Sequence, residues 1–107
     1  MVRRRPAWAE LWWTELEPSG RRPALVLTRP EAVDRLPRLL VAPATTTIRG
    51  LPSEVALGVE DGLPQPCVLN LDTPELVSRE WLVDYIAMLS AARWHEVCAA
   101  LARSVNC

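Results

Sequence analysis

The sequence predicts a single α+β domain: short strands forming a small, strongly bent antiparallel β-barrel, followed by one C-terminal helix. Short apolar segments of strand character follow one another closely, and ten prolines against only four glycines favour short elements with stiff connections. Near the C-terminus the apolar residues change to helical spacing. The 107 residues suffice for one domain over 1–107, and so small a domain often completes its core by pairing with a second copy.

Four strands are expected in the N-terminal half. The segment 9–16 is rich in β-favouring residues and ends at a loop that contains proline and glycine. The apolar run 23–28 indicates a buried strand, and one helical turn over 30–36 follows it. The segment 38–44 predicts the third strand, with Pro43 marking an end or an edge. The alternating segment 53–57 predicts the returning strand after a turn at 49–52.

The C-terminal half predicts two further strands and the helix. The strands are expected over 67–71 and 83–89. Apolar residues then recur at helical spacing at Trp94, Val97, Cys98, Leu101 and Val105. This spacing predicts an amphipathic helix over 91–104 that begins after Ser90 as N-cap and covers the barrel. His95 lies beside the apolar stripe, so we expect it to face solvent.

Several classes of protein are disfavoured by composition. No segment reaches the roughly 18 apolar residues of a membrane span, and no apolar stretch follows the basic start, so residues 1–8 are expected to be a flexible basic arm rather than a secretory signal. Three cysteines without CxxC spacing and a single histidine argue against a disulfide framework or a metal site. We therefore expect a cytoplasmic protein with no metal and no cofactor.

Charge is distributed unevenly along the chain. Residues 1–49 hold nine arginines and five acidic residues, whereas residues 50–107 hold three arginines and eight acidic residues, and lysine is absent. Arginine forms forked hydrogen bonds to phosphate. The arginine-rich half is therefore a weak indication of a nucleic-acid partner, although the net charge of −1 gives none.

Two polar clusters are candidates for a phosphate site. Arg21 and Arg22 stand directly before the predicted second strand, and the segment TTTIRG at 45–50 follows the third. Neighbouring strands can bring both clusters to one end of the barrel, where arginine and hydroxyl donors would bind phosphate. Each cluster by itself is more typical of a solvated rim or of a turn with self-bonded hydroxyls.

The order of several motifs is more specific than either cluster. They are ELWW at 10–13, EP at 17–18, RPALVL at 22–27, VAPATTTIRGLPSEV at 41–55, DGLP at 61–64 and VLNLD at 68–72. In this order, over residues 9 to about 101, the chain resembles the MazF/PemK family of toxin endoribonucleases of type II toxin–antitoxin systems.

The resemblance implies an SH3-like barrel of the MazF/CcdB-like fold that forms a homodimer. It also implies a growth-inhibiting toxin that cuts single-stranded RNA at specific sequences without a metal, and a MazE-like antitoxin as its partner. The 2′-OH of the RNA would attack the adjacent phosphate, giving 2′,3′-cyclic phosphate and 5′-OH ends. The residues that match the family's catalytic pair are Arg22 and Thr45. The candidate RNA contacts are Arg21, Thr46, Thr47, Arg49 and Asp72.

Some questions stay open at this stage. The loop between the first two strands is shorter than in relatives, so no cleavage motif can be transferred. Thr45 is assigned to orientation and charge stabilisation because a hydroxyl is a weak acid, and the group that takes the 2′-OH proton is undecided among Glu15, Glu17 and Asp72. One alternative is a CcdB-type, non-enzymatic inhibitor of DNA gyrase on the same fold; another is a catalytically inactive RNA-binding barrel.

Overall fold

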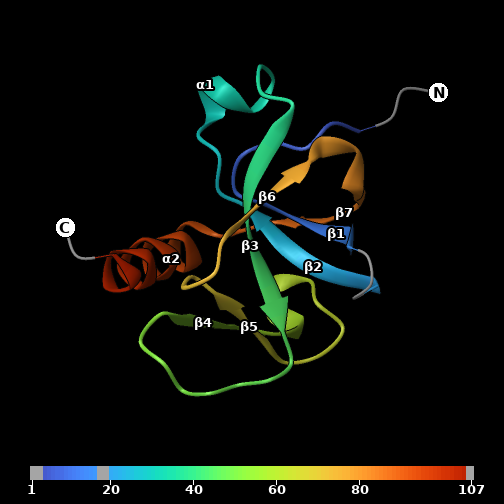
Figure 1. Ribbon diagram of the computed structural model, residues 1–107. Helices are drawn as coiled ribbons and strands as arrows, with labels where there is room; N and C mark the ends of the chain where they lie inside the picture. The colour runs from blue at the N-terminus through green and yellow to red at the C-terminus, as the bar shows by residue number, and fades with distance from the viewer. Residues whose placement is uncertain (1–3, 17–19, 106–107) are drawn as a thin grey trace.

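A computed structural model describes residues 4–16 and 20–105 (Figure 1). Within them lie the strands β1 (Glu10–Leu16), β2 (Gly20–Val26), β3 (Arg38–Thr45), β4 (Glu54–Leu57), β5 (Cys67–Asn70), β6 (Glu75–Ser78) and β7 (Leu82–Met88). The α-helices are α1 (Pro30–Val33) and α2 (Ala91–Ser104), and two short 3₁₀ turns are η1 (Val59–Asp61) and η2 (Arg79–Trp81). No helix in this part of the chain is long and apolar enough to cross a membrane.

All strand pairs are antiparallel, in the order β4-β5-β3-β2-β1-β7, with β6 paired to β3 outside this order. The predicted bent antiparallel sheet with a C-terminal helix is confirmed. The barrel is not closed, because β4 and β7, at the two ends of the order, do not pair with each other. Instead, α2 contacts β4 and contributes Val97 and Ala100 to the core beneath it, so a helix covers the apolar face near that end of the sheet.

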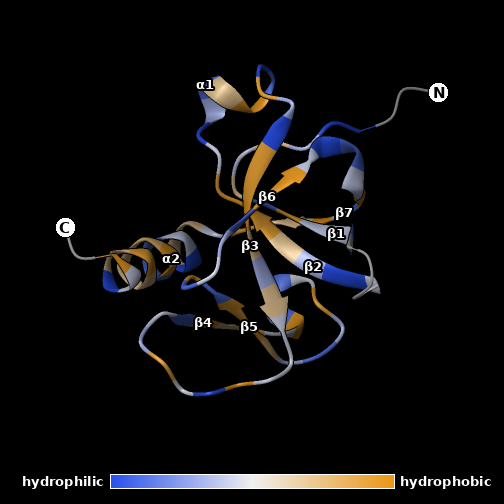
Figure 2. Cartoon of the chain, viewed as in Figure 1, coloured by the Kyte–Doolittle hydropathy of each residue, from blue (hydrophilic) through white to orange (hydrophobic). Residues whose placement is uncertain are grey.

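The central strands are buried on both faces. Leu11 and Leu25 belong to the core cluster under α2, while Trp12 and Val26 belong to a second cluster on the opposite face. Successive residues of a strand point to opposite faces, so adjacent apolar residues supply two cores. In Figure 2, β2 changes from hydrophilic at its outer end to hydrophobic toward the middle of the sheet.

The element boundaries differ from the sequence-based expectation in two informative places. The second strand begins at Gly20, three residues earlier than predicted, so Arg21 and Arg22 lie within it. Gly20 has a φ of +79°, a left-handed conformation that glycine adopts without steric cost. The short strand β6 was not predicted, whereas the helix prediction over 91–104 is confirmed, with the Ser90 hydroxyl accepting the Arg93 N–H at 3.2 Å.

The segment before β1 is attached to the sheet through Glu10, which is only 2% exposed. Its carboxylate accepts hydrogen bonds from the Ala7 N–H (2.9 Å), the Trp12 indole (3.0 Å) and Arg4 (2.8 Å). The Arg4 guanidinium also lies 3.7 Å from the centre of the Tyr85 ring. Residues 1–3 of the predicted flexible arm lie outside the described residues.

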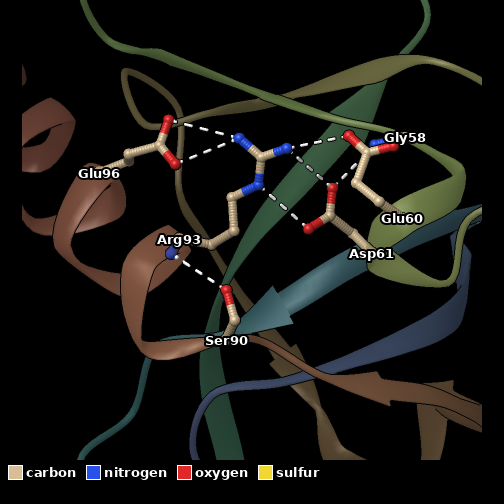
Figure 3. A network of polar contacts seen from close by, with 6 residues as sticks. All are labelled: Gly58, Glu60, Asp61, Ser90, Arg93 and Glu96. Carbon is tan, nitrogen blue, oxygen red and sulfur yellow. Dashed lines mark hydrogen bonds and ion pairs between the residues drawn. The ribbon is translucent and has the colours of Figure 1, made fainter.

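An arginine-centred network joins the start of α2 to η1 (Figure 3). The Arg93 guanidinium reaches Asp61 at 3.1 Å, Glu60 at 2.9 Å and Glu96 at 3.1 Å. Asp61 also accepts the Gly58 N–H at 3.0 Å, and its side chain is only 7% exposed. The hydrogen bond that the Arg93 guanidinium donates to Asp61 is the main reason why the pKa of Arg93 is raised. Asp61 therefore connects the helix to the turn that precedes β5.

We expect Asp61→Asn to lower the free energy of unfolding by about 1–3 kcal/mol, because the half-buried guanidinium loses its best-shielded charged partner. Glu96→Gln is the matched control on the same arginine. Its carboxylate is 51% exposed, so its loss should change stability by less than about 0.5 kcal/mol. Urea unfolding followed by tryptophan fluorescence measures both variants. Equal losses in the two would contradict the assigned role of Asp61.

Candidate functional site

The two clusters singled out from the sequence line the same surface hollows. They come from β2 and from the end of β3, two strands that run apart from the middle of the sheet (Figure 1). The β2–β3 ladder has Ala24 opposite Pro43. Arg22 lies two residues before Ala24, and Thr45 lies two residues after Pro43. Residues two apart in a strand point to the same face, so Arg22 and Thr45 lie on one face of the sheet. Arg22 and Thr45 both line two neighbouring hollows on the surface.

The first of these, the tryptophan hollow, has a volume of about 230 Å³. Its apolar lining is Trp13, Pro23, Ala44, Leu63, Pro64 and Cys67. Its polar lining adds Arg21, Thr46 and Gln65 to Arg22 and Thr45. Burial, and to a lesser extent the charge of Asp61, raises the pKa of the Cys67 thiol, so this group stays neutral at pH 7. The hollow therefore offers a largely apolar surface next to two arginines.

The second, the arginine hollow, has a volume of about 210 Å³ and is mainly polar. It is lined by Arg22, Thr45, Thr47, Arg49, Glu54, Asn70, Thr73, Glu75 and Pro43. Pro43 lies between the residues of β3 that pair with β6 and those that pair with β5. A proline has no N–H to donate to a ladder, so a change of partner strand here leaves no backbone donor unsatisfied.

Arg22 is available to a ligand. Its carbonyl accepts a hydrogen bond from the fully buried Thr14 hydroxyl at 3.0 Å, which holds this part of β2 against β1. The guanidinium makes no hydrogen bond or ion pair within residues 4–16 and 20–105. Since arginine remains protonated in proteins, a positive charge that forms no ion pair with the described residues faces both hollows.

The Thr45 hydroxyl accepts the Thr47 N–H at 3.1 Å. This bond occupies a lone pair and leaves the hydroxyl proton able to point into either hollow, where it can donate to an anion. The bond also gives Thr45 a structural role, because its hydroxyl starts the turn that leaves β3.

Arg21 and Arg22 differ in their surroundings. Both line the tryptophan hollow, but only Arg22 also lines the arginine hollow. The exposed Arg21 guanidinium pairs with Asp84 on β7 and lies 5.6 Å from the centre of the Trp13 ring. Arg21 is therefore already paired with a carboxylate, whereas Arg22 has no such partner among the residues that the structure describes.

The loop between β3 and β4 is held by Glu54, to which the sequence analysis gave no role. Its carboxylate accepts the N–H groups of Arg49 at 3.2 Å, Gly50 at 2.9 Å and Leu51 at 3.2 Å. Gly50 has a φ of +71°, which suits a glycine at this tight position. These bonds keep the Arg49 backbone beside the arginine hollow. A glutamate a few residues after a glycine-containing turn is the only sequence signal for this arrangement.

The other predicted contacts are divided between the hollows. Thr46 lines the tryptophan hollow, while Thr47 and Arg49 line the arginine hollow. Asp72 lines neither: its exposed carboxylate accepts the Ser53 hydroxyl, although its neighbour Thr73 does line the arginine hollow.

The other possible acid–base groups are placed as follows. Glu15 lines neither hollow, and Glu17 lies outside the described residues. His95 is exposed on α2, as predicted. No three His, Cys, Asp or Glu side chains gather into a possible metal site among the residues that the structure describes.

Comparison with known proteins places this arrangement in context. Residues 8–105 match the family model described as PemK-like, MazF-like toxin of type II toxin–antitoxin system. The probable endoribonuclease MazF5 of Mycobacterium tuberculosis is 48% identical over 103 residues, covering 95% of this chain and 94% of that protein. The probable endoribonuclease MazF2 of the same species is 42% identical over 99 residues, covering 92% and 96%.

Among solved structures, the Mycobacterium tuberculosis toxin MazF-mt6 superimposes with a TM-score of 0.83 and 32% identity, covering 89% of this chain and 94% of that one. The MazE–MazF complex (Form-II) of Deinococcus radiodurans gives a TM-score of 0.80 with 26% identity, covering 97% and 98%. These likenesses confirm the predicted MazF-like fold.

Proposed function

We infer that this chain, which belongs to the family of PemK-like, MazF-like toxins of type II toxin–antitoxin systems, is an endoribonuclease that cuts single-stranded RNA. The relatives named as endoribonucleases cover nearly its whole length. The observation that carries the proposal is that Arg22 and Thr45 are shared by two adjacent hollows. A phosphodiester at these two residues can place one nucleoside on each side.

The proposed reaction is attack of a ribose 2′-OH on the adjacent phosphate, which yields a 2′,3′-cyclic phosphate and a 5′-OH. The transition state concentrates negative charge on the phosphate oxygens. The Arg22 guanidinium supplies positive charge and forked donors there, and the Thr45 hydroxyl adds a hydrogen bond. The nucleophile belongs to the substrate, so this route requires no metal-bound water.

The contrast between the hollows supports cleavage at preferred sequences. Trp13 in the tryptophan hollow offers an aromatic ring on which a base can stack, the usual way of holding single-stranded RNA. The arginine hollow offers amide, hydroxyl and carboxylate groups, among them Asn70 and Thr73, which can hydrogen-bond to base edges. The two nucleosides that flank the cut would therefore be selected by different physical means.

We also propose two protein partners. Solved relatives include a Mycobacterial endoribonuclease described as in complex with its cognate antitoxin, and an acidic segment of such an antitoxin would suit the arginines of the two hollows.

A second copy of the chain is the other partner, since large apolar side chains such as Val59 and Met88 are 71% and 61% exposed. Light scattering at micromolar protein should give the dimer mass, and a concentration-independent monomer would refute it.

The function is tested by mixing the purified protein with a long RNA in EDTA. We expect discrete fragments with 2′,3′-cyclic phosphate and 5′-OH ends, because the reaction uses only the RNA and protein side chains. RNA that is bound but stays intact would indicate an inactive RNA-binding protein. Intact RNA together with inhibition of DNA gyrase would indicate the gyrase-inhibitor alternative.

A further inference from the structure

The proposed reaction needs a group that accepts the proton of the attacking 2′-OH. Arg22 cannot do this because arginine stays protonated in proteins, and the Thr45 hydroxyl is too weak a base. His95 lies exposed on α2 and lines neither hollow. The acceptor should therefore be a carboxylate close to Arg22 and Thr45.

Only two carboxylates of the described residues line a hollow that these two residues share. They are Glu54 and Glu75, both in the arginine hollow. Glu54 is committed to the loop, since its Oε1 accepts three backbone N–H groups and its Oε2 accepts the Arg49 N–H at 3.3 Å. The Glu75 side chain is exposed, and its carboxylate makes no hydrogen bond or ion pair with any part of the chain that the structure describes.

The topology explains why Glu75 reaches this hollow. It is the first residue of β6 and pairs with Val41 of β3, whereas Arg22 comes from β2 on the other side of β3. Pro43 and Thr45, which also line the hollow, continue β3 beyond Val41 into the stretch where β5 replaces β6 as its neighbour. A phosphate held by Arg22 and Thr45 would therefore have its adjoining ribose within the same small space as the Glu75 carboxylate.

We propose that Glu75 is the general base of the RNA cleavage inferred above. Its carboxylate takes the proton of the 2′-OH as the 2′-oxygen forms a bond to phosphorus. The bond from phosphorus to the 5′-oxygen breaks, and that oxygen leaves with the bonding pair and takes a proton from water. Glu75 then returns its proton to solvent, so the chain ends unchanged.

The electrostatic surroundings allow a carboxylate at this place. The charged groups that line the arginine hollow are Arg22 from β2, Arg49 from the β3–β4 loop, Glu54 from β4 and Glu75 itself. The Glu54 carboxylate already accepts backbone N–H groups, so it does not engage the guanidinium of Arg22 or Arg49. The positive charges of these two arginines can therefore offset the repulsion between Glu75 and the phosphate. Removal of the Glu75 charge should therefore favour RNA binding, the opposite of its effect on the reaction.

The test is Glu75→Gln, which keeps the size of the side chain and removes its ability to accept the proton. We expect single-turnover cleavage at saturating enzyme to fall by roughly 10²- to 10⁴-fold, the usual contribution of a general base. Affinity for an uncleavable RNA, with one deoxyribose 5′ of the scissile phosphate, should be unchanged or higher, which also shows that the variant is folded.

Glu80→Gln is the matched control, because it removes the same charge from an exposed residue of η2 that lines neither hollow. It should cut at the wild-type rate. Wild-type cleavage by Glu75→Gln would overturn the proposal, and so would an equal loss of affinity and rate, because that result would make Glu75 a binding residue. A wild-type protein that fails to cut RNA would overturn the proposed function and this inference together.

Discussion

A single deoxyribose immediately 5′ of the scissile phosphate is expected to abolish cleavage at that bond. In the proposed reaction the 2′-OH at this position is the nucleophile, and the chain would supply only the groups that surround it. The remaining contacts, to phosphate and to the bases in the two hollows, do not need this hydroxyl. Affinity for the substituted oligonucleotide should therefore stay within a few-fold of the all-RNA value, a modest loss because RNA-binding proteins can contact this group.

The measurement compares fragments from two oligonucleotides that differ only in this one sugar. A deoxyribose on the 3′ side of the scissile phosphate is the control, since that sugar provides the leaving 5′-oxygen and its own 2′-OH takes no part. Cleavage of the first substituted oligonucleotide at the same bond would rule out the cyclic-phosphate route. The nucleophile would then have to be water or a protein side chain.

The second large effect is expected for Arg22→Ala, which should lower the single-turnover rate by roughly 10²-fold or more, the scale seen when a preorganised donor to the transition state is lost. The structure supports this expectation, because the Arg22 guanidinium makes no hydrogen bond or ion pair with the described residues and lines both hollows. Arg22→Lys should restore little, since lysine keeps the charge but not the forked geometry. Thr45→Ala should also slow cleavage strongly, and Thr45→Ser should keep part of the rate because the hydroxyl remains.

Arg21→Ala is the matched control for Arg22→Ala, since it removes the neighbouring guanidinium. Arg21 pairs with Asp84 and lines one hollow only, so we expect mainly weaker RNA binding and a shallower salt dependence as one phosphate contact is lost. If Arg21→Ala were inactive and Arg22→Ala cut normally, the catalytic arginine would be displaced by one residue from our assignment. Normal cleavage by Arg22→Ala and Thr45→Ala together would exclude the mechanism.

Local sequence signals were sufficient for the elements whose residues specify their own conformation. Strand propensity placed β1 at its Trp12 and Trp13, and the helical period together with Ser90 as N-cap placed α2 correctly. The motif order also singled out Arg22 and Thr45, which the structure brings to the same two hollows. These elements and the two site residues are specified by neighbouring residues or by the order of short motifs, so they can be predicted from the sequence without knowing which distant segments pair.

Other features depend on pairing between distant segments. Strand β6 has only four residues and forms a strand because β3 is beside it, and the sheet stays open because its end strands do not meet. Arg21 lines the tryptophan hollow, and its guanidinium lies near the Trp13 ring and pairs with Asp84 of β7, a partner that only the pairing of β1 with β7 brings close.

The site residues also divide into those that the sequence identified and those whose roles depend on the tertiary structure. The sequence by itself determined the composition of the two clusters and the family pattern, from which fold and activity class were inferred. Only the tertiary structure decided that Glu54 holds the loop, that Asp72 bonds to Ser53, and that Glu75 shares a hollow with Arg22. A carboxylate acts as an anchor, a partner or a base according to the groups that surround it, and those groups come from strands that are distant in sequence and adjacent only in the folded sheet.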